Sequence, residues 1–495
     1  MKPIKKIKRS INIVFAVSVS LFVFSCSSEV PNNVYINDNP NKYYVPPPSE
    51  IVKQNPNYYN QPLVTKEYGG VDALEEFDND PKKEDLNPLK ENNEAGPDLS
   101  NETLPDLGKN IDTTIPLKNY SFSPLAQKVY DRVMDDKLTK ESSSTIKKIF
   151  FPSDNNNLLK VLVDGEEIFT TYKDLIAQAE HEVDMVTFIW ESKSDAAKSI
   201  GEGIKLAQQN AKDKQKIVVR IIANDFQLDP RKRMIDDLNE WKKNLKLDET
   251  KIDVQLATYP HIAFGASHSK YLIVDGKKSV VTGANTELVH NFTPKKWHDT
   301  GYLLEGNVSQ TILRDFDESW EKRALHYGCK DRFIECQRIK TPDSPNRDYM
   351  NNIQFSSGFP IIALPKSSRE HLNNDIDNPQ DQGWLAAMEN ANDHINVLTP
   401  NINAAGFQSS VIKAVKRGVT VRIITGLGFN DITESLPTQG GSNEQVMNKL
   451  VAKVLKEDPT NKDKLKFGWY SKDGVKPIIS NGASASHTKF MSIDN

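Results

Sequence analysis

Hydrophobic and polar positions divide the chain into three stretches of different character. An apolar run at residues 11–24 follows a short basic N-terminus. Residues 27–118 contain few aliphatic clusters, whereas from about residue 119 apolar positions recur at the spacings of strands and amphipathic helices. The pattern therefore predicts an N-terminal targeting segment, a spacer and a folded region.

The folded region opens with alternating strand and helix patterns. Short apolar runs predict strands at residues 158–163, 183–190 and 217–223, and amphipathic patterns predict helices at residues 168–180 and 195–211. Strands that alternate with helices are typical of an α/β fold in which helices cover a sheet.

The same series recurs later in the chain. Helix, strand, helix and strand patterns occupy residues 384–391, 395–399, 407–416 and 419–425. Both series contain the sequence Val-Arg-Ile-Ile, which begins at Val219 in the first and at Val421 in the second. Internal repetition of this kind predicts two similar lobes, which we place at residues 119–340 and 341–495.

Composition and charge exclude several classes of protein. Three cysteines are too few for a disulfide-dense scaffold or a four-thiolate zinc site. The long apolar run at the N-terminus stands alone, which argues against a multi-span membrane protein. Residues 66–106 hold 13 acidic and four basic residues, residues 1–10 are basic, and charges elsewhere balance. Nucleic acid is therefore not an expected partner, because binding it usually needs a positive surface.

Residues 1–26 resemble the signal peptide of a bacterial lipoprotein. The apolar run of 14 residues is short for a membrane span and typical of a signal peptide. It ends in the sequence Val-Phe-Ser-Cys, which resembles a lipobox and implies that Cys26 is acylated and becomes the mature N-terminus. We therefore expect an exported, membrane-anchored lipoprotein, and Ser27 resembles signals for the outer membrane where the host has two membranes. An uncleaved anchor helix is the alternative.

Residues 27–118 have the composition of a linker. They hold 12 of the 27 prolines, together with many asparagines and acidic residues. Such a segment cannot bury enough apolar surface to offset its ordering entropy, so we expect a disordered tether between membrane and folded region. A binding motif formed by Tyr43, Tyr44, Tyr58 and Tyr59 is the alternative.

Two copies of one motif carry the candidate chemistry. The pattern H-x-K-x-x-x-x-D occurs at His268, Lys270 and Asp275 and again at His487, Lys489 and Asp494. The copies lie 219 residues apart, and the residues after each lysine predict a buried strand. Alternation along a strand puts the histidine and lysine of each copy on one face. Each copy thus presents an imidazole beside an ammonium group.

The doubled motif resembles that of the phospholipase D superfamily. The resemblance covers roughly residues 150–495 and includes Asn285, which lies seventeen residues after His268. It also includes the sequence Trp-His-Asp-Thr that starts at Trp297. The resemblance implies two similar α/β/α sandwich lobes packed as a pseudo-dimer.

The second copy of the motif lies at the very end of the chain. The family continues with a further strand and a second asparagine, which would fall at position 504, beyond Asn495. We therefore expect an incomplete second lobe, in a fragment of a longer gene product. A truncated and inactive copy is the alternative.

The resemblance also implies roles for the polar residues. His268 is expected to attack phosphorus and form a phosphohistidine, and His487 to act as general acid and base. Lys270, Lys489 and Asn285 are expected to bind the phosphate oxygens. Neither a metal nor another cofactor is expected, because the lysines neutralise the phosphate charge.

Three carboxylates are expected to act differently. Asp275 and Asp494 complete the catalytic motifs but lie on the opposite strand face, so we expect them to form structural hydrogen bonds. Asp299 is a candidate for orienting one of the imidazoles. A surface salt bridge of Asp299 is the alternative.

Cys329 and Cys336 lie between the two motifs. If Cys26 is acylated, they form an even pair, and an exported location permits a disulfide that closes a short loop. Two free thiols are the alternative.

Together the sequence favours a surface-tethered phospholipase D that acts on membrane glycerophospholipids, transferring the phosphatidyl group to water or an alcohol. A cardiolipin synthase-like phosphatidyltransferase, a nuclease of the same superfamily and a non-enzymatic surface lipoprotein are alternatives. Cardiolipin synthase-like enzymes usually carry N-terminal membrane spans, which argues against that alternative. The balanced charge disfavours a nuclease, and the retained histidines and lysines disfavour a non-enzymatic lipoprotein. No obligate protein partner is inferred.

Overall fold

The computed structural model describes residues 122–135, 152–211, 216–225, 233–259, 267–329, 336–355, 358–364, 378–434, 440–471, 477–478 and 483–494. The predicted signal peptide with Cys26 and the predicted linker at residues 27–118 lie outside these residues. Within the described residues, no helix is both long and apolar enough to cross a membrane.

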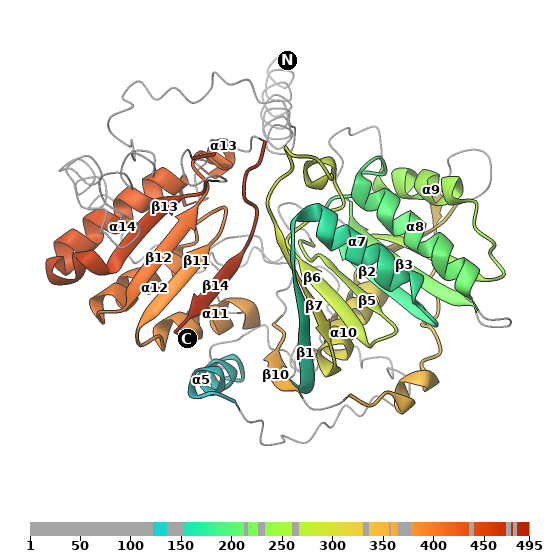
Figure 1. Ribbon diagram of the computed structural model, residues 1–495, viewed down its shortest axis with the longest axis horizontal. Helices are drawn as coiled ribbons and strands as arrows, with labels where there is room; N and C mark the ends of the chain where they lie inside the picture. The colour runs from blue at the N-terminus through green and yellow to red at the C-terminus, as the bar shows by residue number, and fades with distance from the viewer. Residues whose placement is uncertain are drawn as a thin grey trace, which may run out of the picture.

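A ten-stranded sheet forms the centre of the first lobe, in the order β10-β1-β7-β6-β5-β2-β3-β4-β8-β9 (Figure 1). The strands are β1 (Pro152–Val163), β2 (Glu182–Thr187), β3 (Ile217–Asn224), β4 (Ile252–Tyr259), β5 (Tyr271–Val274), β6 (Lys278–Thr282), β7 (Thr300–Glu305), β8 (Leu325–Cys329), β9 (Cys336–Arg338) and β10 (Phe359–Ile362). β2, β3 and β4 run parallel, and β5 lies antiparallel to β2.

Helices cover both faces of this sheet. They are α7 (Asp164–Ala177), α8 (Asp195–Asn210), α9 (Met234–Leu245) and α10 (Asn307–Lys322), joined by the short helices η3 (Leu288–His290) and η4 (Asp348–Asn352). Because side chains alternate along a strand, Val183 and Met185 of β2 pack in the cluster with α7, α8 and α9. Val186, on the opposite face, packs with Phe316 and Trp320 of α10. The first lobe is thus a three-layered α/β/α arrangement.

The second lobe contains a four-stranded sheet in the order β13-β12-β11-β14. Its elements are α11 (Pro379–Glu389), β11 (His394–Leu398), α12 (Ala405–Lys416), β12 (Thr420–Thr425), α13 (Asp431–Glu434), α14 (Asn443–Glu457), η5 (Pro459–Lys464), β13 (Leu465–Trp469) and β14 (Phe490–Ile493). Val421 and Ile423 of β12 pack with α12 and α14 in one cluster. Ile424, on the other face, is 37% exposed, so the described helices cover one face of this sheet.

Four strands of each lobe have the same topology. The order β5-β2-β3-β4 in the first lobe corresponds to β14-β11-β12-β13 in the second, with the first strand antiparallel and the rest parallel. Val183 of β2 pairs with Val274, and Ile395 of β11 pairs with Ile493. The prediction of an α/β fold with two similar lobes is confirmed.

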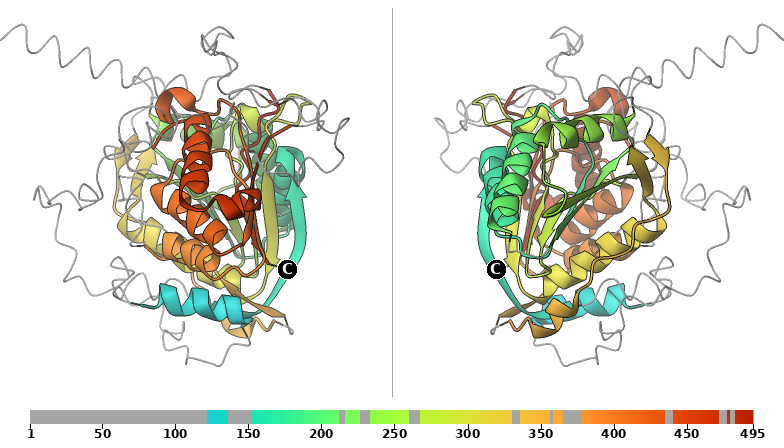
Figure 2. Two further views of the ribbon diagram at one scale, coloured as in Figure 1. Left: turned by 90° about the vertical axis from the view of Figure 1, so that its left-hand side faces the viewer. Right: turned by 90° about the vertical axis from the view of Figure 1, so that its right-hand side faces the viewer.

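Two segments pack outside the lobe in which the sequence placed them. α5 (Pro124–Val133) precedes the first sheet but packs on α11 of the second lobe. There Arg132 donates from Nε to Gln382 Oε1 at 2.7 Å and from Nη1 to Glu389 Oε2 at 3.3 Å. Figure 2 shows α5, in cyan, at the base of the molecule. β10 follows residue 340, yet it pairs with β1 of the first sheet. The chain therefore crosses between the lobes in both directions.

β8 and β9 place the two late cysteines opposite each other. Cys329 pairs with Cys336 in an antiparallel register. Directly opposed residues in such a pair have Cα atoms about 4.5–5.5 Å apart, within the range of about 4.4–6.8 Å found in disulfides. The backbone is compatible with the predicted disulfide, which stays a prediction.

Candidate active site

In each copy of the motif the lysine folds back onto its own histidine. Lys270 Nζ lies 2.8 Å from the carbonyl oxygen of His268 and 3.2 Å from its Nδ1. Lys489 Nζ lies 2.7 Å from the carbonyl oxygen of His487 and 2.6 Å from its Nε2. Strands β5 and β14 begin at the residue after each lysine, as predicted, but the histidine and lysine themselves lie just before the strands and not within them. Each copy nevertheless presents the expected imidazole beside an ammonium group.

Backbone pairing between the lobes brings the second motif to the first. The His298 amide donates to the Ala485 carbonyl at 2.8 Å, and the His487 amide donates to the His298 carbonyl at 2.8 Å. The pairing forms a parallel bridge between His298 and Ser486. His487 is thereby held beside Asp299, the residue that follows His298.

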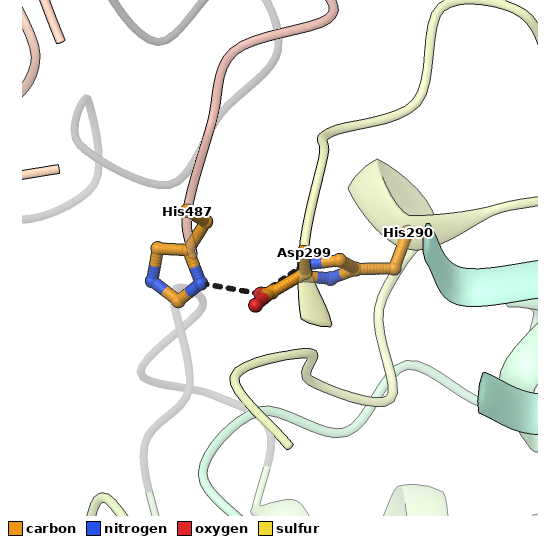
Figure 3. Close-up of side chains that lie close together, drawn as sticks. All are labelled: His290, Asp299 and His487. Atoms are coloured by element: carbon orange, nitrogen blue, oxygen red, sulfur yellow. Dashed lines mark hydrogen bonds and ion pairs between the residues drawn. The ribbon is translucent and has the colours of Figure 1, made fainter. Parts of the chain in front are cut away.

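Asp299 is buried and lies against His487. Its Oδ2 accepts a hydrogen bond from His487 Nδ1 at 2.9 Å, and its Oδ1 accepts one from the Thr300 amide at 2.9 Å (Figure 3). Burial opposes ionisation, but contacts with His290 and His487 hold the pKa of Asp299 well below its usual range. A charged Asp299 fixes the proton of His487 on Nδ1 and leaves the lone pair on Nε2, which faces Lys489 Nζ at 2.6 Å.

Gly283 makes room for this carboxylate. A Cβ at Gly283 would lie 2.2 Å from Asp299 Oδ1, closer than side chains can approach. The glycine of the Gly-Ala-Asn sequence is therefore required where Asp299 turns toward His487.

Asn285 is buried beside a second acid that the sequence did not single out. Its Nδ2 donates to Glu287 Oε1 at 2.7 Å, while its Oδ1 has no hydrogen-bond partner among the described residues. Glu287 is itself buried, and His290 and Asn285 keep its pKa below the usual range against the effect of burial. The predicted phosphate-binding amide thus already has one carboxylate partner.

His290 connects the two buried acids. Its Nε2 lies 3.3 Å from Asp299 Oδ2, and its Nδ1 lies 3.5 Å from Glu287 Oε1. Sequence reasoning gave His290 no role, because the repeated motif does not include it. The spacing of three between Glu287 and His290, which puts both on one side of a helical turn, is the signal that could have found the pair.

The two motifs lie close enough to interact electrostatically. Lys270 above all, then desolvation and Lys489, hold the pKa of His268 well below its ordinary value. Burial and Lys489 lower the pKa of His487 to about 4. Desolvation by the surrounding protein also lowers the pKa of buried Lys270 to about 7, with help from Lys489, and that of the solvent-exposed Lys489 to about 8. Near pH 7 and without a bound anion, the imidazoles of His268 and His487 are therefore neutral, and Lys270 and Lys489 are close to the pH at which they lose their charge.

The motif aspartates lie at the far ends of their strands. Asp275 accepts hydrogen bonds of 2.8–3.0 Å from the amides of residues 180–182, which lead into β2. Asp494 accepts hydrogen bonds of 2.9–3.3 Å from the amides of residues 392–394, which lead into β11. Both aspartates have a positive φ, 50° and 48°. They cap equivalent strands and do not join the histidines.

Three side chains at the site could offer atoms to a metal ion. A nitrogen of His290, an oxygen of Asp299 and a nitrogen of His487 lie within 4.8 Å of one another (Figure 3). However, Asp299 Oδ2 and His487 Nδ1 are 2.9 Å apart, which is the separation of a direct hydrogen bond. The described geometry is that of a hydrogen-bonded acid–histidine pair.

Comparison with known proteins found no matching family model and no matching curated protein. Among solved structures, the chain is similar to a phosphatidylserine synthase from Haemophilus influenzae Rd KW20, with 13% identity, 71% of this chain and 80% of that chain covered, and a TM-score of 0.44. It is similar to Nuc, a phospholipase D family member from Salmonella typhimurium, with 13% identity, 37% and 99% covered, and a TM-score of 0.26. It is also similar to a polyphosphate kinase from Porphyromonas gingivalis, with 11% identity, 54% and 37% covered, and a TM-score of 0.30. At such low TM-scores these likenesses carry no argument, and the chemistry of the site rests on the chain's own residues.

Proposed function

We propose that the chain is a phosphodiesterase of the phospholipase D type, which cleaves glycerophospholipids between phosphorus and the head-group oxygen. The observation that carries the proposal is the hydrogen bond of 2.9 Å between His487 and Asp299, across the two lobes. It sets an oriented imidazole within electrostatic reach of His268 and of Lys489, and Lys489 in turn acts on Lys270. Two imidazoles beside two ammonium groups suit a displacement at an anionic phosphorus centre.

The proposed reaction has two steps. The neutral ring of His268 attacks phosphorus, the bond from phosphorus to the head-group oxygen breaks, and protonated His487 gives that oxygen a proton. His487 then takes a proton from water, whose oxygen attacks the phosphohistidine and releases phosphatidate. An alcohol in place of water gives a new phosphodiester by the same route.

The charge of the substrate prepares His487 for the first step. Without substrate, burial and Lys489 keep the pKa of His487 at about 4, so the ring is neutral near pH 7. A phosphodiester anion beside Lys270 and Lys489 offsets their positive charge and raises that pKa. His487 therefore becomes protonated, and able to act as an acid, when a substrate has bound.

The test of this function uses lipid vesicles. Vesicles of phosphatidylcholine and of phosphatidylethanolamine are incubated with the protein, and released head group and phosphatidate are measured by mass spectrometry. We expect release that EDTA leaves unchanged and that His268→Ala abolishes, and added ethanol should yield phosphatidylethanol. Activity lost in EDTA and restored by a divalent ion contradicts the mechanism. Cleavage of single-stranded DNA without any release from lipid would favour the nuclease alternative.

We further propose that Cys26 anchors the protein in a membrane through acylation. The lipobox-like sequence before Cys26 supports this. Cells that express the protein should incorporate labelled palmitate into it, and Cys26→Ala should abolish the label. Equal labelling of the variant contradicts the lipoprotein interpretation.

A further inference from the structure

His290 is a buried histidine whose two ring nitrogens each face a carboxylate. It is the last residue of η3, and its side chain is 0% exposed. Figure 3 shows His290 and His487 on either side of Asp299. On its other edge, His290 Nδ1 lies 3.5 Å from Glu287 Oε1. Two buried acids this close to one ring need compensating charge, because an uncompensated buried charge costs several kcal/mol.

The positions of the acids distinguish between the protonation states of His290. Among the described residues neither contact has the geometry of a hydrogen bond, so His290 meets the two acids through ion-pair distances of 3.3 and 3.5 Å. A neutral imidazole would supply no charge to compensate them. An imidazolium has an N–H on both nitrogens and can face both acids favourably. The electrostatics agree, because Asp299 and Glu287 together raise the pKa of His290 although burial opposes this.

Other charged groups also act on this cluster. Lys270 and Lys489 interact electrostatically with both Glu287 and Asp299, whereas the ring of His290 lies within 3.5 Å of both. Glu191, whose carboxylate accepts from the amide after Glu287, adds further negative charge. His487 is neutral near pH 7, with a pKa of about 4. The helices α7 and α8 pack against η3 and contribute Asp164 and Asp195, whose carboxylates form ion pairs with Lys296 and Lys198.

The two acids reach opposite halves of the site. Asp299 accepts from His487 at 2.9 Å, and Glu287 accepts from Asn285 at 2.7 Å. A continuous row of contacts, Asn285–Glu287–His290–Asp299–His487, therefore joins the predicted phosphate-binding amide to the acid–base imidazole.

We propose that His290 is a positioning residue which, as an imidazolium, holds Glu287 and Asp299 in place and so couples Asn285 to His487. The proposal rests on the proposed function, because it gives His487 the role of acid. Without the positive ring, the two buried carboxylates repel each other and Asp299 loses its fixed direction. Loss of His290 therefore weakens proton donation to the leaving group more than attack on phosphorus.

The kinetic test varies the leaving group. With a phospholipid whose head group is an alcohol, we expect His290→Gln to lower kcat on the order of tenfold to a hundredfold, part of the acceleration that a general acid supplies. With a p-nitrophenyl diester, whose leaving group needs no proton, the initial burst of p-nitrophenolate reports phosphohistidine formation alone, and its rate should fall less than about threefold. Equal losses with both substrates overturn the proposal, because they indicate a purely structural role.

A matched control separates this effect from the loss of any buried histidine. His326 is also buried in the first lobe, where its Nε2 lies 2.7 Å from the Trp320 carbonyl oxygen. His326→Gln should reduce stability without changing the ratio of the rates on the two substrates. A changed ratio in His326→Gln contradicts the assignment of the effect to His290.

A second measurement does not depend on activity. Nuclear magnetic resonance of the full chain with 15N-labelled histidine distinguishes an imidazolium, with two similar ring nitrogens, from a neutral ring. We expect the spectrum of the wild type to contain the signals of one imidazolium above pH 7. These signals should be absent from the spectrum of His290→Gln. A neutral His290 at pH 7 overturns the proposal even if the protein is an active diesterase. If His290 is an imidazolium but the protein has no diesterase activity, the proposed function is wrong. The proposed coupling of His290 to a catalytic acid is then wrong as well.

A third measurement tests whether His290, Asp299 and His487 bind a metal ion instead. Co²⁺ added to the wild-type protein reports a metal site through its visible absorption. We expect no absorption from a protein-bound ion. Stoichiometric binding that His290→Gln abolishes would show that the cluster holds a metal rather than an imidazolium.

Discussion

The two copies of the motif have the same backbone but different neighbours. In both, the lysine lies against the histidine carbonyl and the aspartate caps the neighbouring strand. His487, however, is hydrogen-bonded to Asp299, whereas in the described part of the chain no carboxylate contacts the ring of His268. The repeat thus supplies the reacting groups, and segments outside the repeat decide which imidazole is oriented for proton transfer.

Removing either imidazole should have the largest effect and should show whether the two copies differ in role. His268→Ala and His487→Ala should each lower kcat on the order of a thousandfold or more, since each removes a nucleophile or a general acid. The double variant should be little worse, because the residues act as one unit. With a p-nitrophenyl diester, His487→Ala should still form the phosphohistidine and His268→Ala should not. Phosphoenzyme trapped in His268→Ala but not in His487→Ala would reverse the roles.

The oriented pair itself can be broken without removing an imidazole. Asp299→Asn keeps the shape but no longer stabilises a proton on His487 Nδ1, so kcat should fall on the order of a hundredfold. Asp164→Asn is the matched control, because Asp164 Oδ1 lies 2.8 Å from His298 Nδ1 in a second acid–histidine pair. The kcat of Asp164→Asn should stay within about threefold of the wild-type kcat. Similar losses in both variants contradict a special role for Asp299.

The dependence of activity on pH should separate the imidazoles from the lysines. Both imidazoles have lowered pKa values, about 4 for His487, so kcat/KM should rise rather than fall from pH 6.5 to pH 5, because a larger share of the free protein then carries the proton that His487 donates. Above pH 7 to 8, Lys270 and Lys489 lose their protons and their charge, and kcat/KM should fall by up to about tenfold per pH unit. Lys489→Arg should move the basic limb to higher pH. A basic limb that starts near pH 10 contradicts the lowered lysine pKa values.

The two capping aspartates should differ in their effect on stability rather than on chemistry. Asp275 is 4% exposed, so Asp275→Ala leaves buried amides unpaired and should cost about 3 kcal/mol. Asp494 is less buried, and Asp494→Ala should cost about 1 kcal/mol. Urea unfolding, with hydrogen exchange at residues 180–182 and 392–394, measures both. Equal losses of stability in the two variants would show that the capping aspartates contribute equally in the two lobes.

Periodicity in the sequence was enough to predict the elements that form the repeat. The predicted strand at 217–223 is β3 (Ile217–Asn224), and the predicted helix at 407–416 lies within α12 (Ala405–Lys416). Both follow from local spacing of apolar residues, which is fixed by the geometry of a helix or strand. The predicted strand at 183–190 extends past the end of β2 because its last residues, although apolar, leave the sheet.

The contacts that assemble the site could not be predicted in this way. Nothing local indicates that His298 forms a bridge with Ser486, 188 residues later, or that His290 lies between Glu287 and Asp299. The crossing of α5 to the second lobe was equally hidden, because an amphipathic helix does not specify which lobe covers its apolar side. Long-range packing decides these contacts.

The bridge between His298 and Ser486 also bears on the order of folding. Residues so far apart in the chain pair late, because the loop between them must close before their contacts stabilise it. The first lobe can therefore complete its own sheet while Asp299 still lacks His487. Under the proposed mechanism, turnover becomes a reporter of the final docking step, and refolding experiments should show activity returning after the secondary structure has formed.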